Sequence, residues 1–210
     1  MSENLKAPVT MKPQTAQTSE RWRKFVPMID EDMRKAKIDA VPRNLAAIVA
    51  KVHTGESIKG KGLFLIGGAG TGKTVRMKFI ATLLEIRMIT AVDLMEELMQ
   101  AETLTDKEDA LNCTPPHWSE VPPHWNDLII DDLGTEPDGQ KVYGTKRYLM
   151  EDAICRRYEC FTDCGRRWKT HFTSNLKPEE IRARYGERVW SRLNEMVVFV
   201  TLAGKDRRIG

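Results

Sequence analysis

The sequence lacks any apolar run close to the roughly 18 residues that a membrane-spanning helix needs. Residues 1–20 also lack the basic start and apolar stretch of a secretory signal. Neither sign of charge dominates, because 33 basic residues face 30 acidic ones and the formal net charge is only +3. We therefore expect a cytoplasmic protein that is not bound to a membrane. The net charge alone does not indicate a nucleic-acid ligand.

Cysteine is scarce as well, with Cys113, Cys155, Cys160 and Cys164 as the four examples. Cys160 and Cys164 have a spacing that zinc sites permit, and with Cys155 and His171 they could be drawn as a zinc site. No second close pair of ligands completes the set, so we favour free, reduced thiols.

The chain is long enough for one α/β domain and a short N-terminal extension. Residues 1–20 are polar, so we expect a flexible arm. Between residues 22 and 53 the apolar positions recur at helical spacing, which predicts two helices. We accordingly expect an N-terminal arm with helices at 1–54, which could dock a partner, and a main domain at 55–210.

Short apolar runs alternate with helical patterns from residue 62 onward, which predicts a parallel five-stranded sheet flanked by helices. The expected strands are 62–66, 87–91, 127–131, 169–173 and 196–202. The expected helices follow residue 74 and cover 93–100, 144–158, 179–185 and 187–195. Ligands of such sheets bind at the carboxyl ends of the strands.

Residues 101–126 have the character of an inserted loop, because Pro-Pro-His-Trp occurs at 115–118 and again at 122–125. We favour a loop whose tryptophans cover the core, since tryptophan is highly buried on average. The alternative is an exposed loop that contacts a partner or DNA.

The segment GGAGTGKT at 67–74 matches the phosphate-binding motif G-x-x-x-x-G-K-[ST] and lies between an expected strand and an expected helix. Glycines let the backbone N–H groups surround phosphates, and the start of the helix adds its positive dipole end. Lys73 is expected to reach the β- and γ-phosphates, and the Thr74 hydroxyl to ligate Mg²⁺. The sequence therefore predicts Mg²⁺ and ATP as cofactors. The expected binding residues are Gly67, Gly68, Ala69, Gly70, Thr71, Gly72, Lys73 and Thr74.

The run LIIDD at 128–132 is typical of a Walker B strand, in which apolar residues precede a carboxylate at the end of the strand. We expect Asp131 to be the metal carboxylate. Asp132 is placed where a base that orients the attacking water would lie. Because the longer glutamate often has this role, we expect hydrolysis to be slow or to require a rearrangement.

Five segments occur in the order typical of an AAA+ ATPase: GGAGTGKT (67–74), LIIDDLGTE (128–136), FTSNLKPEEI (172–181), YGERVWSRLNEM (185–196) and GKDRR (204–208). Together they resemble the DnaC/IstB group of helicase loaders and transposition ATPases. The resemblance implies a P-loop AAA+ core. It also implies that Asn175 is similar to the sensor 1 residue, which can hydrogen-bond the γ-phosphate or its attacking water. The alternative for Asn175, or for Ser174, is a helix N-cap.

The same resemblance implies that Arg188 or Arg192 is the arginine finger, which reaches the nucleotide of a neighbouring subunit. Arg208 resembles the sensor 2 arginine, which contacts the nucleotide of its own subunit. A finger delivered to a neighbour implies head-to-tail self-association into a ring or an open spiral. The alternatives are a solvated helix face for the first two arginines and a solvated basic tail for Arg208.

The leading hypothesis for function is an ATP-hydrolysing replication accessory protein, a helicase loader similar to DnaC that acts with a replicative helicase and single-stranded DNA. An IstB-like transposition ATPase shares the same motifs. A P-loop kinase of a small substrate and a nucleotide-binding protein without hydrolysis are further alternatives. A GTPase is disfavoured because no Asn-Lys-x-Asp motif occurs.

Single-stranded DNA is a possible partner, although residues 96–109, where relatives hold a DNA-contacting insertion, are acidic. We expect the cluster at 21–25 or the basic and aromatic residues between 156 and 169 to be better candidates for contact. The latter are Arg156, Arg157, Tyr158, Arg166, Arg167, Trp168 and Lys169.

Overall fold

The computed structural model describes residues 61–84, 86–113, 126–137, 140–142, 145–165 and 168–202. Several sequence predictions lie outside these residues. They are the N-terminal arm and its two helices, the cluster at 21–25, the repeated Pro-Pro-His-Trp motif, Arg166, Arg167 and Arg208.

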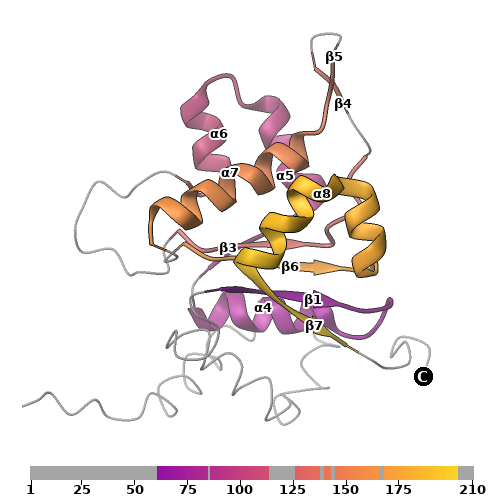
Figure 1. Ribbon diagram of the computed structural model, residues 1–210. Helices are drawn as coiled ribbons and strands as arrows, with labels where there is room; N and C mark the ends of the chain where they lie inside the picture. The colour runs from indigo at the N-terminus through magenta and orange to yellow at the C-terminus, as the bar shows by residue number, and fades with distance from the viewer. Residues whose placement is uncertain are drawn as a thin grey trace, which may run out of the picture. The chain divides into compact units, whose positions relative to one another are not determined.

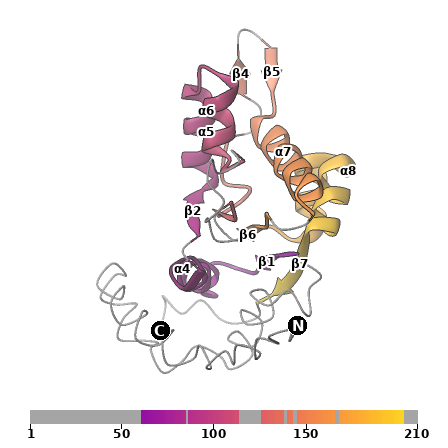
Figure 2. The same cartoon turned by 90° about the vertical axis from the view of Figure 1, so that its left-hand side faces the viewer.

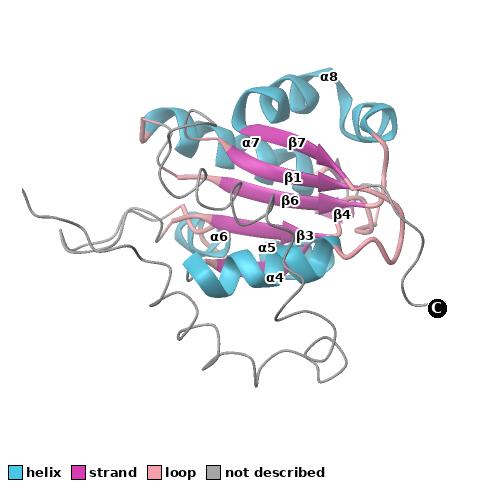
Figure 3. Ribbon diagram, turned by 90° about the horizontal axis from the view of Figure 1, so that it is seen from below, coloured by secondary structure: helices cyan, strands magenta, loops and turns pink. Residues whose placement is uncertain are grey.

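Five parallel strands form the main sheet, as predicted (Figure 1). The strands are β1 (Gly62–Ile66), β2 (Arg87–Thr90), β3 (Leu128–Asp131), β6 (Thr170–Ser174) and β7 (Val197–Thr201). Their order across the sheet is β2-β3-β6-β1-β7. Seen from below, the arrowheads of β1, β3, β6 and β7 point the same way, so the residues that follow these strands meet at one edge (Figure 3).

Alternate residues of the central strands supply two hydrophobic cores, one on each face of the sheet. Leu63 and Leu65 of β1 pack in one core with Met77 and Ile80. Those two residues belong to α4 (Lys73–Leu84), the helix that covers this face (Figures 1 and 2). Phe64 of β1 packs in the other core, against which α5, α7 and α8 lie. Burial on both faces explains why the strands read as continuous apolar runs.

Residues 91–110 form two helices, whereas one was expected at 93–100. The expectation of a loop throughout 101–126 is wrong where the second helix lies. The first helix is α5 (Ala91–Gln100), and the second is α6 (Leu104–Ala110). In α6 the Thr103 hydroxyl accepts from the Asp106 N–H at 3.1 Å, and the Asp106 carboxylate accepts from the Thr103 N–H at 2.8 Å. This reciprocal capping stabilises a short polar helix that lacks the apolar periodicity used to predict helices.

The predicted helix at 144–158 is displaced, because its expected first residues belong to a hairpin. Strands β4 (Gln140–Val142) and β5 (Thr145–Arg147) pair antiparallel, and α7 (Leu149–Asp163) begins only after them. The two strands are short and polar, so neither gives a clear alternating pattern in the sequence.

The two short helices predicted at 179–185 and 187–195 are observed as the halves of α8 (Pro178–Met196). They are separated at Gly186, which has φ 78° and ψ 169°, a backbone conformation that glycine adopts at little cost. Pro178 begins the first half, where a missing N–H is tolerated. Among the described residues, no helix is both long and apolar enough to cross a bilayer.

Candidate nucleotide-binding site

The P-loop connects the carboxyl end of β1 to the first turn of α4, as the motif predicts. Gly70 and Gly72 have φ values of 68° and 82°, which place both in the left-handed region that glycine adopts readily. A Cβ atom at Gly67 would lie 2.5 Å from the carbonyl oxygen of Leu202, so this position tolerates no side chain. The Thr71 hydroxyl donates to the Gly68 carbonyl at 2.8 Å and holds the turn from inside. The loop is thus built tightly at the start of a helix, where the N–H groups and dipole favour phosphate.

Lys73 lies inside the loop, with only 5% of its surface exposed. Its Nζ donates to the carbonyl oxygens of Gly67 at 2.7 Å and Gly68 at 2.9 Å. The third acceptor is Oδ1 of Asn175, at 2.7 Å. Lys73 and Asn175 are 102 residues apart in the sequence, and β6 brings them together because it lies next to β1 in the sheet.

Asn175 follows β6 and its side chain is exposed. The alternative of an N-cap for Asn175 or Ser174 is not supported, because the cap of α8 is Lys177, whose N–H donates to Glu180 at 2.6 Å. The Ser174 hydroxyl instead donates to the Leu133 carbonyl at 2.5 Å and accepts from the Leu176 N–H at 3.1 Å. Ser174 therefore joins the loops that follow β3 and β6.

Asp131 is buried at the end of β3, where its Oδ1 accepts two hydroxyl hydrogen bonds. Thr74 donates at 3.3 Å and Thr173 of β6 at 2.5 Å. The hydroxyl of Thr74 and the carboxylate of Asp131 are hard oxygen ligands of the type that Mg²⁺ prefers. They come from the P-loop helix and the Walker B strand, so the donor set fits a metal bound beside a triphosphate.

Thr173 was missed by sequence reasoning. The polar residues of β6, a strand buried at every position, are a signal that could have indicated its role. Besides its bond to Asp131, the Thr173 hydroxyl accepts from the Asp132 N–H at 2.8 Å. One side chain therefore fixes both acidic residues relative to each other.

Asp132 is half-buried and has φ 54°, a left-handed conformation that few residues other than glycine adopt. Its carbonyl accepts from the Thr135 N–H at 3.1 Å and from the Thr135 hydroxyl at 2.8 Å. The chain thus turns sharply directly after Asp131. This turn places Asp132 beside Asp131 on a loop held at both ends.

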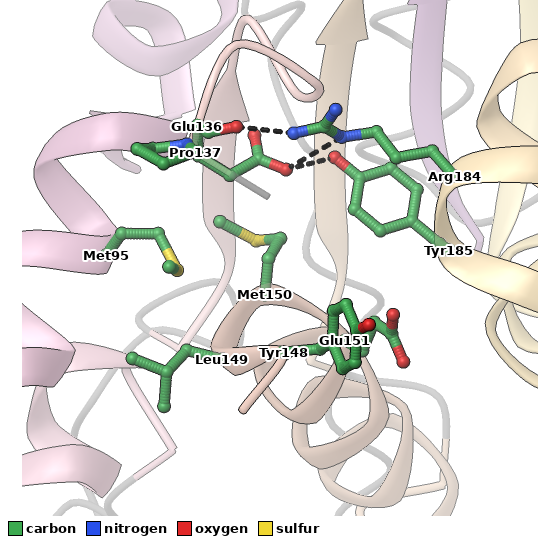
Figure 4. A pocket seen from close by; sticks show the side chains of 9 residues that line it. All are labelled: Met95, Glu136, Pro137, Tyr148, Leu149, Met150, Glu151, Arg184 and Tyr185. Atoms are coloured by element: carbon green, nitrogen blue, oxygen red, sulfur yellow. Dashed lines mark hydrogen bonds and ion pairs between the residues drawn. The ribbon is translucent and has the colours of Figure 1, made fainter. Parts of the chain in front are cut away.

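The far end of that loop is held by Glu136, a second residue that sequence reasoning missed. Its carboxylate accepts from the Gly134 N–H at 2.8 Å and from the hydroxyl of Tyr185 in α8. Arg184 pairs with the carboxylate at 3.5 Å and donates to the Glu136 carbonyl. Burial, together with the neighbouring carboxylate, raises the pKa of Tyr185, so its hydroxyl remains a donor. We call Glu136, Arg184 and Tyr185 the Glu136 clamp; it lines a small pocket with Met95, Pro137, Tyr148, Leu149, Met150 and Glu151 (Figure 4).

Arg188 and Arg192 lie four residues apart on the second half of α8, beyond Gly186. The Arg188 side chain is exposed. Arg192 is half-buried: its guanidinium lies 5.3 Å from the ring centre of Tyr158, and Nη1 donates to the Cys155 sulfur at 3.3 Å. Both partners belong to α7, on the face of the sheet opposite α4. The role of either arginine at a neighbouring nucleotide remains a prediction.

Arg157 corrects one prediction, because it is fully buried and therefore unavailable for DNA contact. Its donors bond to the Thr170 hydroxyl at 2.8 Å and to the carbonyls of Leu111, Asn112 and Lys169 at 3.1, 3.1 and 2.7 Å. Of its neighbours, Arg156 pairs with Glu108 and Glu159, and Tyr158 donates to Glu195 at 2.6 Å. This end of α7 is thus engaged within the domain.

Cys155, Cys160, Cys164 and His171 were considered above as a zinc site. Within the part of the chain that the structure describes, no group of three or more histidine, cysteine or acidic side chains is placed to hold a metal. All four cysteines are free thiols, and the neighbouring Cys160 thiol lowers the pKa of Cys113 to about 7. His171 is fully buried, and its Nδ1 accepts from the Leu63 N–H at 3.1 Å. Burial lowers the pKa of His171 to about 3, so the ring is neutral at physiological pH.

No protein-family model and no curated protein matches the sequence. Solved structures do match. A DnaC helicase loader is 22% identical over 83% of this chain and all of its own, with a TM-score of 0.53. DnaI is 21% identical over 84% of this chain and 89% of its own, with a TM-score of 0.54. Domain III of the Thermotoga maritima replication initiation protein DnaA is 16% identical over 86% of this chain and 70% of its own, with a TM-score of 0.53. The chain therefore shares the α/β fold of these replication proteins, and its resemblance to helicase loaders is confirmed at the level of the fold.

Proposed function

We propose that this P-loop AAA+ protein binds Mg²⁺ and ATP and hydrolyses the nucleotide as a replication accessory ATPase. The observation that carries the proposal is the meeting of Lys73, Asp131 and Asn175 at the carboxyl ends of β1, β3 and β6. These three residues come from segments spread over more than half of the described chain. Their convergence at the edge where α/β sheets bind ligands supports a nucleotide site.

In the proposed mechanism the P-loop N–H groups bind the phosphates, and Lys73 exchanges its three carbonyl and amide acceptors for phosphate oxygens. Thr74 and Asp131 would hold Mg²⁺, which supplies charge neutralisation at the phosphates. Release of Asn175 Oδ1 from Lys73 frees the amide to contact the γ-phosphate or the attacking water. Asp132 orients that water and accepts its proton as the bond to the γ-phosphorus forms and the bond to ADP breaks.

Arg188 and Arg192 are proposed to act on the nucleotide of a neighbouring subunit, which requires head-to-tail self-association. The exposure of Arg188 and the contacts that orient Arg192 are compatible with such a surface. Arg208 is proposed to contact the nucleotide of its own subunit. Replacing each α8 arginine separately with alanine should spare nucleotide binding, and one of the two variants should lose turnover. If turnover per wild-type subunit does not depend on protein concentration, the idea of a finger between subunits fails.

Lys73→Ala tests nucleotide binding most directly. The variant should lose measurable affinity for ATP, because it removes the buried Lys73 ammonium, which we propose to contact the phosphates. Lys78→Ala is a matched control, since this lysine is exposed on the same helix. Unchanged ATP affinity in Lys73→Ala would overturn the site.

The solved structures named DnaC helicase loader and DnaI support helicase loading as the leading hypothesis for the partner. An IstB-like partnership with a transposase remains the alternative, because the motifs are shared. Co-purification with the replicative helicase of the host, with and without ATP, separates the two. Recovery of a transposase in place of the helicase would favour the alternative.

A further inference from the structure

Cys113 and Cys160 are two buried thiols that the proposed nucleotide chemistry does not use. Cys113 lies just beyond the end of α6, and Cys160 lies on α7. The two thiols hydrogen-bond each other, although the residues are more than 40 positions apart in the sequence. The fold therefore brings two sulfur atoms into contact in its interior.

The packing of α6 against α7 places this pair. Arg156 and Arg157 precede Cys160 by about one helical turn, so the three residues lie on neighbouring positions of one side of α7. Arg156 pairs with Glu108 of α6. Arg157 donates to two carbonyls in the turn that follows α6, and to the Cys113 sulfur at 3.9 Å. This side of α7 thus meets the end of α6, where Cys160 lies against Cys113.

Arg157 gives Cys113 a cationic neighbour. The arginine is fully buried, and of the acceptors that it bonds in the described part of the chain, the Cys113 sulfur is the one that can carry a negative charge. The hydrogen bond from Cys160 and the charge of Arg157 lower the pKa of Cys113, and the same hydrogen bond raises the pKa of Cys160. Cys113 is therefore the thiolate of the pair, and the thiolate is the reactive form of cysteine.

We infer that Cys113 and Cys160 form a reversible oxidation site, at which a hydroperoxide converts the two thiols to an intrachain disulfide. The Cys113 thiolate attacks one oxygen of the hydroperoxide, so that an S–O bond forms and the O–O bond breaks. The departing oxygen takes a proton and leaves as water or an alcohol, and Cys113 becomes a sulfenic acid.

The second step closes the disulfide. The Cys160 sulfur attacks the Cys113 sulfur, the S–S bond forms, and the S–O bond breaks. The hydroxide leaves with the Cys160 proton as water. The two thiols together lose two electrons, and the hydroperoxide gains them.

The surroundings of the pair favour a disulfide that is easily reduced again. Thiols already in hydrogen-bond contact can reach the S–S bond length of about 2.05 Å by rotation of their side chains. Arg157 stabilises the ionised, reduced Cys113, and the neutral disulfide loses that interaction. A pair whose reduced form is stabilised has a disulfide that is more readily reduced than a structural one. The competing explanation, that both cysteines only fill the core as small apolar side chains, predicts thiols that stay reduced.

The test treats the reduced full chain with a few equivalents of hydrogen peroxide and counts the remaining thiols after denaturation. Two of the four thiols should be lost, and the mass should fall by two hydrogen atoms. Dithiothreitol should restore all four. Cleavage after Phe161 separates Cys160 from Cys164, so the linked peptides identify the pair without any variant.

Four variants provide the matched comparison. Cys113→Ala and Cys160→Ala should each form no intrachain disulfide. Cys155→Ala and Cys164→Ala should lose two thiols, as the wild type does. Cys155 is an informative control because its sulfur also accepts from an arginine, Arg192 at 3.3 Å, whereas burial raises its pKa.

Urea unfolding of the wild type adds a second readout that needs no variant. The cross-link restricts the unfolded chain, so oxidation should raise the unfolding midpoint by about 1 M, and dithiothreitol should reverse the shift. A midpoint that does not change on oxidation would contradict a disulfide between residues so far apart in the sequence.

Three results would overturn the inference. They are a wild type that keeps all four thiols, oxidation of Cys113 beyond the sulfenic acid without a link to Cys160, and a disulfide that joins Cys164 in place of either residue. The inference does not rest on the proposed function. The pair lies near the amino ends of β3 and β6, whereas the P-loop lies at the carboxyl edge of the sheet. ATP affinity should therefore be the same before and after oxidation, and the loss of ATP binding in Lys73→Ala is measured separately.

Discussion

Replacement of Asp132 by asparagine should separate catalysis from folding. The residue has φ 54°, and its N–H donates to the Thr173 hydroxyl at 2.8 Å. Asparagine and aspartate are both enriched several-fold at such left-handed positions, so Asp132→Asn should keep the turn and the backbone hydrogen bond. The change removes the negative charge and the basicity of the carboxylate.

The size of the effect follows from the proposed role. A positioned general base contributes roughly 10²- to 10⁴-fold to a rate, which corresponds to about 3 to 5 kcal/mol of barrier. We expect turnover to fall within that range. The free energy of unfolding should change by less than about 1 kcal/mol, because the residue is half-buried and its backbone contacts remain.

Asp132→Glu is the matched control. It retains a carboxylate but places a residue less suited to a left-handed conformation at φ 54°, at a cost of about 1 kcal/mol. We therefore expect Asp132→Glu to keep measurable turnover but to be less stable, whereas Asp132→Asn should lose turnover and keep its stability.

The assays are ATP turnover at saturating nucleotide, affinity for a fluorescent ATP analogue, and urea unfolding. Affinity should be close to wild type in both variants, since the P-loop is intact. Turnover of Asp132→Asn within about threefold of wild type would refute the role of Asp132 as base. Loss of folding in the same variant would refute the argument from the left-handed turn.

Three further predictions concern residues around the site. Tyr185→Phe removes the hydroxyl that holds Glu136, and turnover should fall about tenfold while ATP affinity is kept, because a catalytic loop is displaced; equal turnover would contradict this. Arg157→Met should lower the free energy of unfolding by about 3 kcal/mol or more, as several buried acceptors lose their donor, and binding of single-stranded DNA per folded molecule should not change. Burial lowers the pKa of His171 from 6.5 to about 3, so between these pH values the unfolded chain takes up a proton that the folded chain does not, and the free energy of unfolding falls as the pH falls. In urea unfolding, the stability of the wild type relative to His171→Asn should drop by about 2 kcal/mol from pH 7.5 to 5.0. A difference that does not change with pH would contradict the burial argument.

The sheet and the P-loop could be predicted because their determinants are local. The strand GLFLI, the glycines at 67–72 and the run LIID each carry their own pattern, so five strands were located to within two residues of their observed ends. The elements that were missed have weak local patterns. Helix α6 depends on capping by Thr103 and Asp106, and the β4–β5 hairpin has only three residues in each strand.

The sequence by itself determined which residues we propose to bind a nucleotide, because the P-loop, Asp131 and Asn175 are recognisable from short motifs and their order. Only the tertiary structure decided which side chains meet. Lys73 donates to Asn175, the Thr173 hydroxyl hydrogen-bonds both Asp131 and Asp132, and Tyr185 donates to Glu136. Each of these contacts joins residues more than 40 positions apart. The physical reason for the first two contacts is the strand order, because β6 lies between β1 and β3 and no local pattern encodes that arrangement. The third contact depends on the packing of α8 near the loop that follows β3. The same packing removed Arg157 from the surface, where its charge alone had suggested a DNA contact.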